Sequence, residues 1–180
     1  MSKVIFHGHT FKTKISAAEI DKAVSAVAEK LNSDLRGKTP LFVAVLNGSF
    51  MFTSDLLKKI KIDCEVSFIK VASYEGVSST GKLTELIGLN ESVNGRTVII
   101  VEDIVDTGST IENVWKQLSE MGATEIRVAT LLFKPKAYTK ALPVEYVAIE
   151  VPNDFLIGYG LDYDGLGRNL EDIYVLDDQI

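Results

Sequence analysis

Apolar side chains recur along the chain with two periods, one typical of amphipathic helices and the other of buried strands. A first helix is expected over residues 15–31, where Ser16 and Glu19 have the spacing of a capping box and Ile15 and Ile20 that of a hydrophobic staple. Its apolar face consists of Ile20, Val24, Val27 and Leu31. This pattern predicts a helix that packs one face against a core.

The rest of the pattern alternates strands with helices. We expect strands in LFVAVL (41–46), CEVSFIKVASY (64–74), RTVIIV (96–101), IRVATLLF (126–133), YVAIEV (146–151) and IYVL (173–176). A second helix is expected over 50–60. A third follows residue 110, with Ile111, Val114, Trp115, Leu118 and Met121 on its apolar face and Gly122 at its end. Continuous apolar strands followed by helices predict an α/β fold, in which a mostly parallel sheet is covered on both faces.

Polar segments follow two of these strands. Asn47-Gly48 comes after the strand at 41–46, and residues 102–110 come after the strand at 96–101, which the turn Asn94-Gly95 precedes. Ligands of such folds bind at the carboxyl ends of the strands. We therefore expect both segments to face one crevice.

Composition narrows the class of protein. The chain has 180 residues, 46% of them apolar and 24% charged, which fits one globular domain with a real core. A net charge of −6 argues against a nucleic-acid surface, and one cysteine, Cys64, excludes an intramolecular disulfide or a multi-cysteine zinc site. The opening residues soon turn polar and the apolar runs are too short to span a bilayer, so a cytoplasmic protein is expected.

Two histidines near the start, His7 and His9, would face the same side of a strand. Such a pair could contribute to a metal site, but a third ligand is missing nearby. The favoured interpretation is a pair of surface histidines.

The stretch VIIVEDIVDTGST (98–110) carries the clearest chemistry. The turn 106–110 lies between a strand and a helix N-terminus, where free backbone N–H groups and the helix dipole favour an anion. It lacks the lysine of an ATP-binding loop, so a phosphate monoester suits it better than a triphosphate. Glu102 and Asp103 could accept hydrogen bonds from vicinal hydroxyls or contribute to a magnesium site. Phosphate beside a diol describes a ribose 5-phosphate.

Two other interpretations of the same stretch exist. An acidic pair after an apolar strand also occurs in phosphoacceptor receiver domains, but there it follows the first strand, and here it lies past the middle of the chain. Asp106 could also be a helix N-cap without any ligand. The ribose-phosphate interpretation accounts for more of the residues.

The stretch 98–110 closely resembles the phosphoribosyl pyrophosphate motif of type I phosphoribosyltransferases. LNGSF (46–50), SY (73–74), LLFKP (131–135) and NDFLIGYGLDYDGLGRNL (153–170) resemble the hypoxanthine and hypoxanthine-guanine enzymes of that family, in the same order and over nearly the whole chain. The resemblance implies a single domain over residues 1–180. Its small hood is formed by the chain ends, mainly about 153–180 with the N-terminal few residues.

The resemblance also implies roles for the residues of the motif. Glu102 and Asp103 match contacts to the ribose hydroxyls, and Asp106 matches the general base that faces the purine ring nitrogen. The 5-phosphate is expected on Thr107, Gly108, Ser109 and Thr110. The family often has a longer side chain where Ser109 stands, which matters little for a site made by the backbone.

Further roles fall on the other matching segments. Asn47-Gly48 matches the pyrophosphate loop, with a peptide Leu46–Asn47 that is commonly cis; the family often has a basic residue at Asn47, so only the backbone role carries over. Arg168 matches a second pyrophosphate contact. Magnesium (Mg2+) is expected with Asp162 and with the acids of the motif. The purine pocket is expected at Lys134, which would contact the 6-oxo group, Phe155, which would stack, and Leu156, through its backbone.

The implied reaction is purine salvage. The phosphoribosyl group of phosphoribosyl pyrophosphate would pass to hypoxanthine, and to guanine, giving IMP or GMP, in a homodimer or homotetramer. Ser73-Tyr74 would lead into a mobile lid over residues 75–83 that excludes water. The alternatives are a regulator that senses phosphoribosyl pyrophosphate and an adenine or pyrimidine phosphoribosyltransferase, which Lys134 disfavours.

Overall fold

The computed structural model describes residues 2–72, 84–89 and 91–177, and these residues form two sheets. The larger sheet has the strand order β5-β4-β3-β6-β7-β8. Its strands are β3 (Leu41–Leu46), β4 (Glu65–Ala72), β5 (Thr84–Ile87), β6 (Thr97–Val105), β7 (Glu125–Phe133) and β8 (Tyr146–Glu150). All neighbours pair in parallel except β5, which pairs antiparallel with β4.

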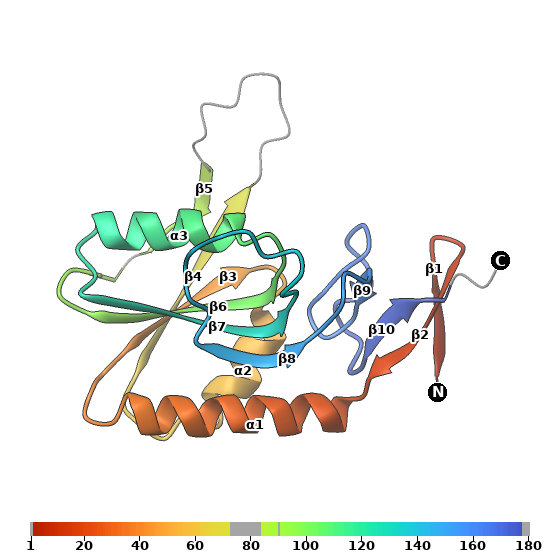
Figure 1. Cartoon of the computed structure of the whole chain (residues 1–180), viewed down its shortest axis with the longest axis horizontal. Helices are drawn as coiled ribbons and strands as arrows, with labels where there is room; N and C mark the ends of the chain where they lie inside the picture. The colour runs from red at the N-terminus through yellow and green to blue at the C-terminus, as the bar shows by residue number, and fades with distance from the viewer. Residues whose placement is uncertain (1, 73–83, 90, 178–180) are drawn as a thin grey trace.

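Helices cover both faces of this sheet (Figure 1). They are α1 (Ala17–Asp34), α2 (Phe50–Leu57) and α3 (Ser109–Glu120), with α3 on one face and α1 and α2 on the other. Side chains of β3 alternate accordingly: Phe42 packs in the core that includes α1 and α2, and Val43 packs in the core that includes α3. The predicted α/β fold with a mostly parallel sheet is confirmed. None of the helices described is long and apolar enough to cross a membrane.

The capping box at the start of α1 is also confirmed. Ser16 N–H donates to the Glu19 carboxylate (2.9 Å) and Glu19 N–H donates to Ser16 Oγ (3.4 Å). The helix begins at Ala17 and continues to Asp34, three residues past the predicted end. In contrast, α2 ends at Leu57 rather than at 60. Helix ends are the part of a pattern that depends most on local turns.

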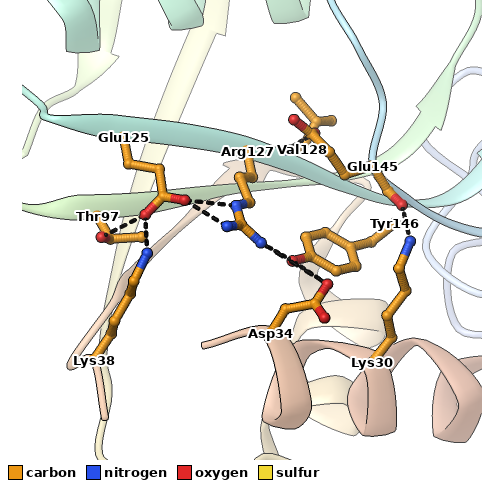
Figure 2. Close-up of polar contacts among 9 residues, drawn as sticks. All are labelled: Lys30, Asp34, Lys38, Thr97, Glu125, Arg127, Val128, Glu145 and Tyr146. Carbon is orange, nitrogen blue, oxygen red and sulfur yellow. Dashed lines mark hydrogen bonds and ion pairs between the residues drawn. The ribbon is translucent and has the colours of Figure 1, made fainter. Parts of the chain in front are cut away.

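A polar network joins the end of α1 to β7 and β8 (Figure 2). The Arg127 guanidinium donates to the Tyr146 hydroxyl (2.6 Å), which donates to the Asp34 carboxylate (3.1 Å). The Glu125 carboxylate accepts hydrogen bonds from Lys38 and from Arg127. The bond from Lys38, followed by those from its other partners, lowers the pKa of Glu125 to about 2.

The second sheet is small and antiparallel, and it lies beyond one end of the larger sheet together with both chain ends (Figure 1). Its order is β1-β2-β10-β9, with β1 (Lys3–Phe6), β2 (His9–Ile15), β9 (Leu156–Ile157) and β10 (Ile173–Leu176). The segment 173–176 is a strand as predicted. It pairs with β2 and β9 instead of joining the parallel sheet, because no crossover helix lies between β8 and β10 among the described residues to bring the chain back in parallel.

The placement of the two histidines on one strand was wrong. His7 lies in the turn between β1 and β2 with φ 51°, and His9 begins β2. Both are exposed, as expected, and both rings make edge contacts with Tyr163 (centroids 5.0 and 6.0 Å). No group of three potential metal ligands is found among the residues described.

Candidate active site

The loop after β3 and the acids of β6 meet at the carboxyl edge of the sheet. Strand β6 runs four residues further than predicted, so Glu102 and Asp103 lie within it. A Cβ atom on Gly48 would be 1.6 Å from Asp103 Oδ2, so a side chain at this position would displace the carboxylate. Asn47-Gly48 and the acidic pair therefore meet at the same edge of the sheet. The peptide Leu46–Asn47 is cis, as expected.

The two acids of β6 are crowded and incompletely bonded. Glu102 is buried, and its Oε2 has no hydrogen-bond partner among the described residues. Burial raises the pKa of Glu102 well above its ordinary range, and the neighbouring Asp103 raises it further. Burial also raises the pKa of Asp103, whose Oδ1 accepts from Ile104 N–H (2.9 Å). Such a pair is suited to a ligand that brings hydroxyl donors or a cation.

The turn between β6 and α3 encloses a small cavity. The cavity has a volume of about 80 Å³ and is lined by Glu102 and by residues 104–111. Gly108 immediately precedes α3 with φ 86°, and a Cβ there would be 2.4 Å from the Tyr138 ring. Thr107, Ser109 and Thr110 are exposed around the turn. A hollow at a helix N-terminus ringed by hydroxyls is suited to an anion.

Asp106 and Lys134 form an ion pair beside this turn. Lys134 Nζ lies 2.9 Å from Asp106 Oδ2, and Lys134 N–H donates to the carbonyl of Val105 (3.0 Å). The lysine side chain is 12% exposed and that of the aspartate 48%, so the carboxylate faces the open side. The sequence did not predict this contact. The signal for it was that both residues directly follow neighbouring parallel strands.

Leu156 lies in β9 of the small sheet and Phe155 directly precedes it, whereas Lys134 directly follows β7 of the large sheet. Leu156 is buried in β9, whereas the Phe155 side chain is 48% exposed. The Phe155 ring rests edge-on against Tyr163 (centroids 5.4 Å, 79°) and near Phe11 (6.3 Å). The sequence did not predict that Tyr163 and Phe11 are neighbours of Phe155, because an isolated aromatic residue in a sequence indicates only core packing.

Asp162 and Arg168 are brought together with the loop after β3. Arg168 Nη2 is 2.6 Å from Asp162 Oδ1, and its Nη1 donates to the carbonyl of Gly160 (2.6 Å). A Cβ on Gly160 would lie 2.0 Å from the carbonyl oxygen of Gly48, so the two backbones are in direct contact. The positive charge of Arg168 also acts to lower the pKa of Asp103. Ser73, Tyr74 and the expected lid lie outside the described residues.

Comparison with known proteins identifies the family. Residues 16–164 match the phosphoribosyl transferase domain. The chain is 36% identical over 170 residues to a hypoxanthine-guanine phosphoribosyltransferase of Streptococcus pneumoniae, with 94% of each chain covered. The chain belongs to the hypoxanthine-guanine phosphoribosyltransferase family. It is also 38% identical over 175 residues to the "Bifunctional protein TilS/HprT" of Listeria innocua, of which it covers 27%.

Solved structures agree with this assignment. A hypoxanthine phosphoribosyltransferase of Staphylococcus aureus superposes on this chain with a TM-score of 0.86 at 34% identity. The superposition covers 92% of this chain and 90% of the Staphylococcus aureus chain. The Trypanosoma cruzi hypoxanthine phosphoribosyltransferase superposes with a TM-score of 0.87 at 33% identity, covering 96% and 94%. The enzyme therefore has the type I phosphoribosyltransferase fold that its sequence predicted.

Proposed function

We propose that the enzyme transfers the 5-phosphoribosyl group of phosphoribosyl pyrophosphate to hypoxanthine or guanine, releasing pyrophosphate and forming IMP or GMP. The observation that carries the choice of base is the ion pair between Lys134 and Asp106. One edge of a 6-oxopurine presents a carbonyl oxygen next to a ring N–H. A donor-only ammonium beside an acceptor-only carboxylate is complementary to that edge.

The donor substrate is proposed to bind where the loop after β3 and the acids of β6 meet the segment of Gly160 and Arg168. Its ribose hydroxyls would donate to Asp103 and to Glu102, whose buried Oε2 has no hydrogen-bond partner in the part of the chain that the structure describes. Its 5-phosphate would occupy the cavity at the turn 107–110. Its pyrophosphate would lie between the backbone of Asn47-Gly48 and Arg168, because a guanidinium can form planar paired hydrogen bonds with phosphate oxygens.

Magnesium fits the donor set as an ion shared between protein and substrate. In the part of the chain that the structure describes, Glu102, Asp103 and Asp162 do not form a ready-made cluster of metal ligands. Mg2+ commonly takes one or two carboxylates and completes its shell with water and phosphate oxygens. These acids would hold the ion together with the substrate, and the bound ion would neutralise charge on the departing pyrophosphate.

The chemical step needs a proton acceptor and an orienting donor. As the bond from the anomeric carbon to the pyrophosphate oxygen breaks and the bond to the purine nitrogen forms, the purine loses a proton, and Asp106 accepts it. Lys134 holds the 6-oxo group, so the ring nitrogen faces the anomeric carbon. Phe155 would stack on the purine, and the backbone of Leu156 would hydrogen-bond to its edge. A lid entered by Ser73-Tyr74 would exclude water, because hydrolysis competes with transfer.

The test compares initial rates with hypoxanthine, guanine and adenine. Adenine carries an amino group where Lys134 needs an acceptor, and such mismatches reduce kcat/KM by roughly 10⁴-fold. We expect efficient transfer to hypoxanthine or guanine, very poor transfer to adenine, and a reduced hypoxanthine-to-adenine ratio in Lys134→Gln. A wild-type hypoxanthine-to-adenine ratio of kcat/KM below about ten would contradict the 6-oxopurine assignment. Tight binding of phosphoribosyl pyrophosphate without turnover of any base would indicate a regulator instead.

A further inference from the structure

The segment Gly158–Gly160 has a backbone that side chains rarely adopt. Gly158 and Gly160 both have φ 100°, and Tyr159 between them has φ 47°, in the left-handed region that disfavours residues other than glycine. A Cβ on Gly158 would lie 2.1 Å from the carbonyl oxygen of Asp172, and one on Gly160 would lie 2.0 Å from that of Gly48. The segment is thus pressed between the start of β10 and the loop that follows β3. A tyrosine held in this conformation points to a specific contact.

That contact is a hydrogen bond to α2. The Tyr159 side chain is buried, and its hydroxyl donates to Asp55 Oδ2 (2.7 Å), while Asp55 Oδ1 accepts from Lys58 (2.8 Å). Burial, followed by the Asp55 carboxylate, raises the pKa of Tyr159, so the hydroxyl stays protonated and remains a donor. Asp55 lies on the helix that directly follows the loop Asn47-Gly48. The bond therefore ties the segment to the element that carries this loop.

The same segment carries one half of the proposed pyrophosphate site. Gly160, next to Tyr159, accepts the 2.6 Å hydrogen bond from Arg168, and Gly160 N–H donates to the Arg168 carbonyl (2.9 Å). The other half, the loop at Gly48, follows β3 of the large sheet. The two halves come from segments more than a hundred residues apart in the chain. Their relative position must therefore be maintained by tertiary contacts.

We propose that Tyr159 is a positioning residue that, through Asp55, holds Gly160 and Arg168 against the Asn47-Gly48 loop and thereby determines the affinity for the pyrophosphate part of the donor. The proposal rests on the proposed function. The base is anchored separately, because Leu156 pairs with Val175 in the small sheet and Lys134 follows β7. Loss of the Tyr159 hydroxyl should therefore affect the donor and spare the base.

The experiment measures KM for both substrates, kcat and thermal stability in Tyr159→Phe, which keeps the ring and removes the hydroxyl. Hydrogen bonds to charged acceptors are among the stronger ones, so KM for phosphoribosyl pyrophosphate should rise roughly 5- to 30-fold. KM for hypoxanthine should stay within about twofold, less than the effect of one ordinary hydrogen bond. In the reverse reaction, KM for pyrophosphate should rise as well.

Tyr146→Phe is the matched control. Tyr146 is also a buried tyrosine, its hydroxyl also bonds an aspartate, Asp34, and it lies in the network of Figure 2 rather than against the loop at Gly48. We expect this control to lose stability without a change in KM for phosphoribosyl pyrophosphate. Asp55→Ala removes the same bond from the other side and serves as the test if Tyr159→Phe does not fold. The double variant Tyr159→Phe with Asp55→Ala should be no worse than the poorer single one.

The possible failures are distinguishable. An unchanged KM for phosphoribosyl pyrophosphate in Tyr159→Phe, or an equal rise of both KM values, overturns the positioning role while the proposed function stands. The positioning role is also overturned if Tyr146→Phe raises KM for phosphoribosyl pyrophosphate as much as Tyr159→Phe does, since lost stability alone would then explain the effect. If the wild type transfers phosphoribosyl to no purine, the proposed function itself fails.

Discussion

At the residue scale, the contact between Asp106 and Lys134 joins the proposed proton acceptor to the proposed donor for the 6-oxo group. A carboxylate that is to accept a proton must remain accessible, and Asp106 remains 48% exposed although it is paired. The lysine is 12% exposed, so its ammonium has given up most of its water and gains from any acceptor that the purine brings. In the proposed function, an incoming purine would bond to both Lys134 and Asp106, whose side chains already orient one another in the free enzyme.

Asp106→Asn tests the role of the carboxylate. The amide keeps the shape of the side chain but cannot accept the proton, so kcat should fall roughly 10²- to 10⁴-fold while the fold and donor affinity persist. Rates should be measured at saturating substrates under conditions where chemistry is rate-limiting. Asp21→Asn is the control, because Asp21 is also paired with a lysine, Lys59 (2.7 Å), on an exposed surface, and its rate should not change. A rate close to wild type in Asp106→Asn would remove Asp106 as the base.

At the scale of elements, the network around Glu125 fastens α1 to the edge of the sheet where β6 and β7 begin (Figure 2). The pKa of Glu125 is lowered from 4.5 to about 2. The contribution of this carboxylate to stability is therefore fully present above pH 4.5 and is lost as the pH falls through about 2. A shift of this size corresponds to about 3 kcal/mol, which solvent screening reduces to about 1–2 kcal/mol. The carboxylate thus stabilises the scaffold of the site from its opposite edge.

Glu125→Gln should lower the free energy of unfolding by about 1–2 kcal/mol at pH 7, because the neutral amide loses the charge-assisted bonds from Lys38 and Arg127. The deficit relative to wild type should shrink between pH 4.5 and 2, as the wild-type carboxylate becomes protonated. Denaturant unfolding across this pH range measures it. Glu120→Gln is the control, since the pairing of Glu120 with Lys116 is long (3.9 Å) and solvent-exposed. A deficit independent of pH would exclude the electrostatic explanation.

At the scale of the whole molecule, the proposed donor site lies where two sheets meet. Gly160, which follows β9, packs on Gly48, which follows β3, and Arg168 acts electrostatically on Asp103, so segments attached to both sheets contribute to the proposed site. A donor that contacts both sheets should stabilise their arrangement. Binding to the folded state alone raises stability according to ligand concentration relative to Kd.

Phosphoribosyl pyrophosphate with magnesium, at about 100 times its Kd, should stabilise the enzyme by about 2.7 kcal/mol. For a chain of this size that is a rise in Tm of about 5–10 °C. Excess chelator should remove most of that rise and abolish turnover, and added magnesium should restore both. Ribose 5-phosphate is the control. Because it lacks the pyrophosphate, the Tm rise that it produces should change little when chelator is added. A full Tm rise and full activity in chelator would remove the metal from the mechanism.

Much of this molecule could be predicted from its sequence, because the signals are local. The capping box of Ser16 and Glu19, the apolar strand at 41–46 and the turn 106–110 each depend on residues close in the chain, and local sterics and hydrogen bonding decide them. The periodic pattern also determined the layers of the fold, since strands buried on both faces require helices on each. The family followed from several such segments in the correct order.

Tertiary structure alone decided the contacts between these segments. No spacing in the sequence indicates that Tyr159 bonds Asp55 or that the strand at 173–176 joins the N-terminal hairpin. The pairing of Lys134 with Asp106 required, in addition, that the two strands they follow be neighbours. Such contacts depend on which strands lie side by side and how closely two backbones approach. The sequence by itself therefore determined the three helices, the strands of the parallel sheet, the acidic segment after residue 101 and the turn 106–110. The arrangement of the site across two sheets was decided by packing, because it arises from distances between residues that are remote along the chain.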